Sequence, residues 1–314
     1  MPAIPGPTEH YELVEENRLT TGGADASDSP DESEGSEQPK SPGKTYRAGR
    51  NLPAAIAVGL VLGGAIILAL LTVKEIFVGI VAAAVAVSTF ELIGALWRGA
   101  GIKVTLWPVL LGGQAMVWLS WPFERNGVLA AFVITMLACF VWRLRGGVQG
   151  YLRDVSASVF TAAYVPLFAS FAAMLVVTED GAARVLCFMI AVVSSDTGGY
   201  VAGMLFGRHP MAQTISPKKS WEGFAGSTAA GVLGSALSVV LLLGGQWWQG
   251  VLFGAAIAVT ATVGDLVESL IKRDLGIKDM GNLLPGHGGL MDRMDSLLPS
   301  AVVSWLLLRL FVPV

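Results

Sequence analysis

Residues 250–270 have the sequence GVLFGAAIAVTATVGDLVESL, in which Asp265 and Glu268 are the only charged side chains. A helix of about 20 apolar residues spans the roughly 30 Å hydrocarbon core of a bilayer. Inside hydrocarbon every backbone N–H and C=O group must be paired within its own segment, as a helix does. This stretch therefore predicts a transmembrane helix that carries two carboxylates near one end.

Eight further apolar stretches resemble the first in length and composition. They are 53–73, 76–97, 104–123, 127–142, 155–177, 185–206, 223–243 and 297–313. The whole chain has only 14% charged residues, whereas soluble domains have about 25%. The short alternating segments of a membrane β-barrel are not seen. We therefore predict an all-α, polytopic membrane protein with about nine transmembrane helices.

The positive charges give this topology an orientation. If the N-terminus is cytoplasmic, seventeen lysines and arginines fall on the cytoplasmic side, and only Lys74, Arg125 and Arg184 fall outside. Loops rich in Lys and Arg stay in the cytoplasm. We therefore expect a cytoplasmic N-terminus and a multi-pass protein of the cell (plasma) membrane.

The first 52 residues differ from the rest of the chain. Between Thr21 and Pro42 the sequence is mostly Gly, Ser, Asp, Glu and Pro, too polar to bury the surface that folding requires. The polar start also lacks the basic and apolar regions of a cleaved signal peptide. We expect a disordered, acidic cytoplasmic tail over 1–52, of undetermined role, and a transmembrane catalytic domain over 53–314.

Two predicted cytoplasmic loops, 207–222 and 271–296, contain most of the residues suited to chemistry. Together they hold seven bases, five acids, His209 and His287, whereas the outer loops are short and poor in charge. A reaction with a charged, soluble substrate is therefore expected at the cytoplasmic face.

Four carboxylates lie at the predicted inner ends of the last two helices. Asp265 and Glu268 are three residues apart and share a helix face; Asp292 and Asp295 repeat this spacing. Charged groups at this depth are costly unless they are paired or bind a cation. An oxygen-rich set without a Cys or His cluster favours Mg²⁺ over zinc. A purely structural pairing with Lys272 or Arg273 is the alternative.

Basic and glycine-rich segments lie beside these acids. Lys218–Lys219 and Lys272–Arg273 could neutralise a polyphosphate, although such pairs also arise from topology alone. Residues 285–289, PGHGG, offer backbone N–H groups to an anion, and His287 could donate to a phosphate or be merely structural. This segment has neither the Walker pattern nor the dinucleotide-binding pattern.

Two acids are predicted deep in the membrane. Asp196 lies within the polar run SSDTGGY (194–200), and intramembrane ionisable residues are candidates for function. The glycines of that run could instead serve close helix packing. Glu91 has no comparable polar setting, and its role stays open between function and the pairing of a partner group.

Residues 269–295, SLIKRDLGIKDMGNLLPGHGGLMDRMD, resemble the signature of the phosphatidate cytidylyltransferase (CDP-diglyceride synthase) family. The segments 216–223, SPKKSWEG, and 195–198, SDTG, are similar to other motifs of that family. The resemblance covers roughly residues 190–296.

The resemblance implies a nucleotidyltransferase of phospholipid biosynthesis. CTP and phosphatidic acid would react in the lipid bilayer to give CDP-diacylglycerol and pyrophosphate, with no nucleic acid involved. It also implies dependence on Mg²⁺, with Asp265 and Asp292 as metal ligands and Asp295 as a further candidate. A second cation and a homodimer are compatible with it.

The candidate site residues fall into two groups. The catalytic candidates are Asp265, Asp292, Asp295, Lys219, Lys272, Arg273 and His287. The substrate-binding candidates are Ser195, Asp196, Ser216, Lys218, Lys278, Gly288, Gly289 and Arg293.

Other functions remain as alternatives. The intramembrane carboxylates could form the relay of a cation-coupled transporter, and a CTP-dependent polyprenol kinase would have a similar architecture. A membrane scaffold with a recruiting tail would leave 271–296 unexplained. The sequence does not determine acyl-chain preference, oligomeric state or the exact metal ligands.

Overall fold

The computed structural model describes residues 63–64, 66–281, 283 and 288–313. The predicted tail and most of the first predicted span, 53–73, lie outside these residues. Seven helices in the described part of the chain are long and apolar enough to cross a membrane. The prediction of a polytopic, mainly helical membrane protein is therefore confirmed.

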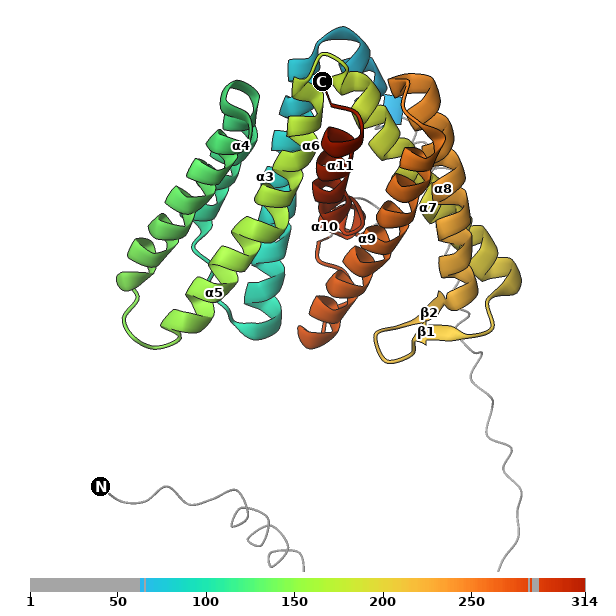
Figure 1. Ribbon diagram of the computed structural model, residues 1–314. Helices are drawn as coiled ribbons and strands as arrows, with labels where there is room; N and C mark the ends of the chain where they lie inside the picture. The colour runs from blue at the N-terminus through green and yellow to red at the C-terminus, as the bar shows by residue number, and fades with distance from the viewer. Residues whose placement is uncertain (1–62, 65, 282, 284–287, 314) are drawn as a thin grey trace, which may run out of the picture. The chain divides into compact units, whose positions relative to one another are not determined.

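The elements follow one another along the chain as labelled in Figure 1. They are α3 (Lys74–Ala100), α4 (Leu106–Leu144), α5 (Tyr151–Ala162), η2 (Ala163–Leu167), α6 (Phe168–Val177), α7 (Gly181–Phe206), β1 (Pro210–Ala212), β2 (Ser216–Ser220), α8 (Trp221–Leu243), α9 (Trp247–Asp274), α10 (Met291–Met294) and α11 (Leu297–Phe311). The short π-helix η2 joins α5 to α6, so that 151–177 forms one span. The ends of most predicted spans lie within four residues of the ends of these helices.

Helix α4 contains two of the predicted spans. Its 39 residues would extend for about 58 Å as one straight helix, roughly twice the hydrocarbon thickness. The helix is broken at Glu124, which has φ 46° and ψ −134°, and the chain folds back there (Figure 1). A Cβ atom on Gly112 would collide with Thr135, so the two halves are packed side by side. They correspond to predicted spans 104–123 and 127–142.

The prediction of an all-α fold missed a small sheet. Strands β1 and β2 form an antiparallel pair in which Pro210 faces Ser220 and Ala212 faces Ser216. Their sequences, PMA and SPKKS, lack the alternation of apolar and polar residues by which a strand is recognised. The hairpin occupies the cytoplasmic loop predicted over 207–222.

Helices α7, α8 and α9 pack at close range through glycines. A Cβ atom on Gly198 would strike the backbone of Gly226, and one on Gly254 would strike the backbone of Gly231. Small residues let helix backbones approach closely in a membrane. This packing brings the SSDTGGY segment of α7 next to the carboxylate-bearing end of α9.

A buried ion pair joins the end of α4 to the start of α5. Arg143 Nη2 lies 2.9 Å from Asp154 Oδ2, and the Asp154 side chain is 1% exposed. Asp154 Oδ1 also accepts a hydrogen bond from the backbone N–H of Lys103. The carboxylate of Asp154 thus connects three segments of the chain.

We predict that Asp154→Ala lowers the free energy of unfolding by about 3–5 kcal/mol, because it leaves Arg143 buried without its partner. Thermal unfolding in detergent measures the loss. Arg153→Ala is the matched control, because Arg153 contacts the same carboxylate at 3.3 Å from an exposed position and should contribute less than about 1 kcal/mol. Equal losses in the two variants would contradict this assignment.

Candidate active site

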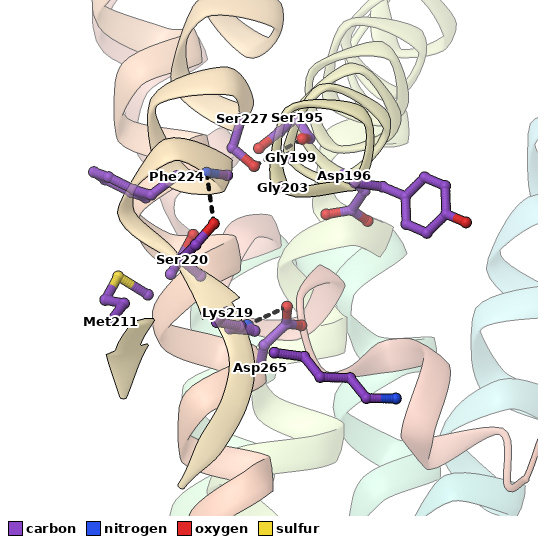
Figure 2. A pocket seen from close by; sticks show the side chains of 14 residues that line it. Ser195, Asp196, Gly199, Gly203, Met211, Lys219, Ser220, Phe224, Ser227 and Asp265 are labelled. Atoms are coloured by element: carbon purple, nitrogen blue, oxygen red, sulfur yellow. Dashed lines mark hydrogen bonds and ion pairs between the residues drawn. The ribbon is translucent and has the colours of Figure 1, made fainter. Parts of the chain in front are cut away.

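A cavity of about 320 Å³ lies between α7, β2, α8 and α9. Figure 2 shows Asp196 from α7, Lys219 from β2 and Asp265 from α9 around it. The lining residues are Ser195, Asp196, Gly199, Tyr200, Gly203, Met211, Lys218, Lys219, Ser220, Gly223, Phe224, Ser227, Thr262 and Asp265. The cavity thus combines two ammonium groups, two carboxylates and several hydroxyls.

Lys219 and Asp265 form an ion pair at the cavity wall. Lys219 Nζ donates to Asp265 Oδ2 over 2.6 Å, and both side chains are partly exposed. The hairpin missed by sequence analysis places Lys219 here, 46 residues before Asp265. A soluble ligand that enters the cavity can reach both charges.

The start of helix α8 forms another part of the wall. The side chain of Ser220 caps this helix by accepting from the backbone N–H of Gly223 over 3.1 Å. A helix N-terminus has a partial positive charge and attracts anions. Together with Lys218 and Lys219, it makes this wall suitable for a phosphate group.

Lys272 lies about two helical turns beyond Asp265 on α9. Its ammonium group bridges two carboxylates. Its Nζ lies 3.0 Å from Asp292 Oδ1 and 3.3 Å from Glu268 Oε1. Glu268 is fully buried, and within the described residues neither of its oxygens has a hydrogen-bond partner of good geometry. A buried carboxylate with unsatisfied oxygens is costly and is suited to binding a cation.

Asp292 anchors the loop that precedes α10. Its carboxylate accepts hydrogen bonds from the backbone N–H groups of Met280, at 3.0 Å to Oδ2, and Gly289, at 2.8 Å. Gly288 has φ +81°, a left-handed conformation that favours glycine. Asp292 therefore holds Met280 and Gly289 in addition to pairing with Lys272.

Glu91, whose role the sequence left open, holds the same loop from α3. Its Oε2 accepts a hydrogen bond from the backbone N–H of Met291 over 2.8 Å. A Cβ atom on either Gly281 or Gly289 would collide with the Glu91 carboxyl group. The glycines of the loop thus allow it to pack against Glu91. The only signal of this role in the sequence was an isolated acid in an apolar helix.

Arg98, two turns further along α3, contacts the loop from the same helix. Its Nη2 donates to the backbone carbonyl oxygen of Met280 over 2.9 Å. Helix α3 therefore holds both ends of the loop, although it lies nearly 200 residues away in the chain.

The carboxylates near the end of α9 form a candidate magnesium site. Asp295 lies within electrostatic range of Asp196, Asp265 and Glu268, and Mg²⁺ prefers such oxygen ligands. However, no three Asp, Glu, His or Cys side chains among the described residues already form a metal-binding group. The unsatisfied oxygens of Glu268 and the crowding of negative charge nevertheless fit a divalent cation.

The remaining predicted site residues do not line this cavity. Arg273 donates from Nε to the carbonyl oxygen of Ile215 over 3.4 Å and so contacts the hairpin. Ser216 begins β2, Lys278 is exposed, and Arg293 lines a separate apolar cavity. His287 lies outside the described residues. Three further residues line the cavity but were not among the predicted site residues: Ser227, Thr262 and Phe224. They do so because helices α8 and α9 turn these faces toward α7.

Comparisons with known proteins all point to one family. Residues 53–311 match the model of the cytidylyltransferase family. The chain is 53% identical over 282 residues to a phosphatidate cytidylyltransferase of Mycobacterium leprae (strain TN), with 85% of this chain and 90% of the relative covered. It is 35% identical over 186 residues to a phosphatidate cytidylyltransferase of Helicobacter pylori (strain J99), with 59% and 66% covered.

We predict that Glu91→Ala speeds hydrogen–deuterium exchange of the Met291 amide about tenfold, the usual effect of losing one hydrogen bond. Glu91→Gln retains an acceptor oxygen and should leave exchange close to that of the unmodified protein. Glu75→Ala is the control, because Glu75 is an exposed acid on the same helix. If Glu91→Ala left the exchange unchanged, the loop would not depend on this contact.

Proposed function

Because the chain belongs to the cytidylyltransferase family, we propose that it transfers the cytidylyl group of CTP to phosphatidate, giving CDP-diacylglycerol and pyrophosphate. The relatives named above are phosphatidate cytidylyltransferases, one of them more than half identical over most of its length. The observation that carries the proposal is the pair of ammonium–carboxylate contacts, Lys219–Asp265 and Lys272–Asp292, at the carboxylate-bearing end of α9.

The proposed reaction needs no nucleophile from the protein. An oxygen of the lipid phosphate attacks the α-phosphorus of CTP, the bond from that phosphorus to the bridging oxygen breaks, and pyrophosphate leaves with its electron pair. Catalysis of phosphoryl transfer rests mainly on positioning and on neutralisation of charge.

Lys219 and Lys272 have the positions suited to neutralising phosphate oxygens. Each is already held by a carboxylate, which fixes the ammonium group before the substrate binds. Preorganised charges stabilise a transition state without reorganising during the reaction. Lys218 and the N-terminus of α8 add positive potential beside Lys219, where one end of the triphosphate would lie.

Mg²⁺ is the proposed cofactor, with Asp265, Asp292 and Glu268 as its candidate oxygen donors. When bound, the ion would supply positive charge to the phosphates of CTP. Asp292 would have to exchange its contact with Lys272 for the metal, because its oxygens already accept from loop amides. Asp295 is a further candidate ligand of the metal, and a second cation in the site is also proposed.

The proposed topology retains nine spans, a cytoplasmic N-terminus and a site on the cytoplasmic face of the cell membrane. It is supported by the basic residues Arg98 and Arg143, which end α3 and α4, as the positive-inside rule requires of cytoplasmic helix ends. The disordered tail over 1–52, the cytidylyltransferase domain over 53–314 and a homodimer are likewise proposals.

The test of the proposed function is an assay with purified protein, labelled CTP, phosphatidate and Mg²⁺. We expect labelled CDP-diacylglycerol and pyrophosphate in equal amounts, and chelation of Mg²⁺ should abolish both. CDP together with a phosphorylated polyprenol would instead indicate a kinase. A folded sample that turns over no nucleotide would contradict the assignment as an enzyme.

We predict that Lys219→Met lowers kcat/KM for CTP about 100-fold, because it removes a charge-assisted contact worth about 1.5–3 kcal/mol and leaves Asp265 unpaired. Steady-state kinetics with varied CTP measure the change. Lys103→Met is the control, because Lys103 is exposed and lies outside the cavity. An unchanged kcat/KM in Lys219→Met would remove Lys219 from the proposed site.

A further inference from the structure

We propose that a second cavity, lined by Ile66, α3, α6, α7 and the segment from Leu290 to Ala301, binds an acyl chain of the phosphatidate substrate. This inference rests on the proposed function. The acyl cavity, as we call it, has a volume of about 380 Å³, within the range of small-molecule sites.

The lining of the acyl cavity is almost wholly apolar. Phe77, Ile80 and Ala84 contribute from α3, Ala172 from α6 and Phe188 from α7. Among the described residues that line it, Arg293 alone is charged. A site of this kind suits a hydrocarbon chain with an anionic group at one end.

Helix α10 connects the acyl cavity to the carboxylate site. Leu290, Arg293 and Met294 face the acyl cavity, whereas Asp292 faces Lys272. Residues three and four apart share one face of a helical turn, and the residue between them points elsewhere. A lipid at α10 could therefore direct its phosphate toward Lys272 and Arg293 while one chain enters the acyl cavity.

The length of the acyl cavity matches one leaflet. On α3 the residues that line it run from Phe77 to Val87, a rise of about 15 Å along one continuous helix. Half of the hydrocarbon core is about 15 Å thick. An acyl chain that starts at α10 would thus extend along this wall.

Packing also favours an occupant. The acyl cavity is a half-open, apolar space that the described side chains do not fill, and its walls lack packing contacts there. A hydrocarbon chain would restore those contacts. Because such a chain leaves one apolar medium for another, it gains little affinity by entering. The effect of the acyl cavity is therefore to position the lipid and to discriminate by chain length.

The experiment narrows the acyl cavity and compares two substrates. Ala172→Phe fills it from α6, and Ala84→Leu fills it less severely from α3. Ala130→Phe is the matched control, because Ala130 is exposed on α4 and does not line the acyl cavity. Each purified variant is assayed with CTP and Mg²⁺ on dioleoyl-phosphatidate and on dihexanoyl-phosphatidate.

We expect Ala172→Phe to lower kcat/KM for the dioleoyl substrate about tenfold, as overpacking of a filled site does. The loss for the dihexanoyl substrate should be less than about twofold, since short chains leave most of the acyl cavity unfilled. Ala84→Leu should likewise lower kcat/KM more for the dioleoyl than for the dihexanoyl substrate. This variant tests the proposal if Ala172→Phe does not fold. Ala130→Phe should leave both substrates unaffected.

Two results would overturn the inference. Equal losses on both substrates would mean that the substitutions disturb the fold or the carboxylate site. Unchanged turnover of both substrates would mean that a resident bilayer lipid, or nothing, occupies the acyl cavity. Failure of the unmodified protein to make any liponucleotide would instead refute the proposed function itself, and the two failures are thereby distinguished.

Discussion

The arrangement of the site depends on the cost of placing carboxylates at the end of an apolar helix. Glu268 is fully buried on α9, and an ionised group in such a place must be compensated by a nearby cation. Lys272 supplies that charge and also pairs with Asp292. Asp292 in turn holds the loop before α10 through backbone N–H groups. One ammonium group thus connects α9, the loop and α10.

The second level of organisation is the close contact of α7, α8 and α9. Their glycines allow backbone approach, and the side chains of Ser195 and Asp196 are thereby brought to the same cavity as Asp265 (Figure 2). The hairpin between α7 and α8 adds Lys219. Because the helices are rigid and the hairpin is tied to them, the charges are positioned before a ligand binds. This preorganisation is what a phosphoryl-transfer site requires.

Helix α3 has a supporting role that its composition conceals. Its composition is that of an ordinary apolar span, yet Glu91 and Arg98 hold the loop at Met291 and Met280. The same helix forms one wall of the acyl cavity. A single element therefore contacts the glycine-rich loop near its C-terminal end and an apolar cavity along its N-terminal half.

The sequence alone determined that the chain is a helical membrane protein, because the length and continuity of its apolar segments are properties of single helices. It also made Lys219, Asp265, Lys272 and Asp292 candidate site residues, since charged residues in or beside apolar spans are conspicuous. It could not show which charge pairs with which, nor that Glu91 binds the loop, nor that β1 and β2 form. These depend on contacts between residues up to 200 positions apart. Only the packing of the helices decides such distances.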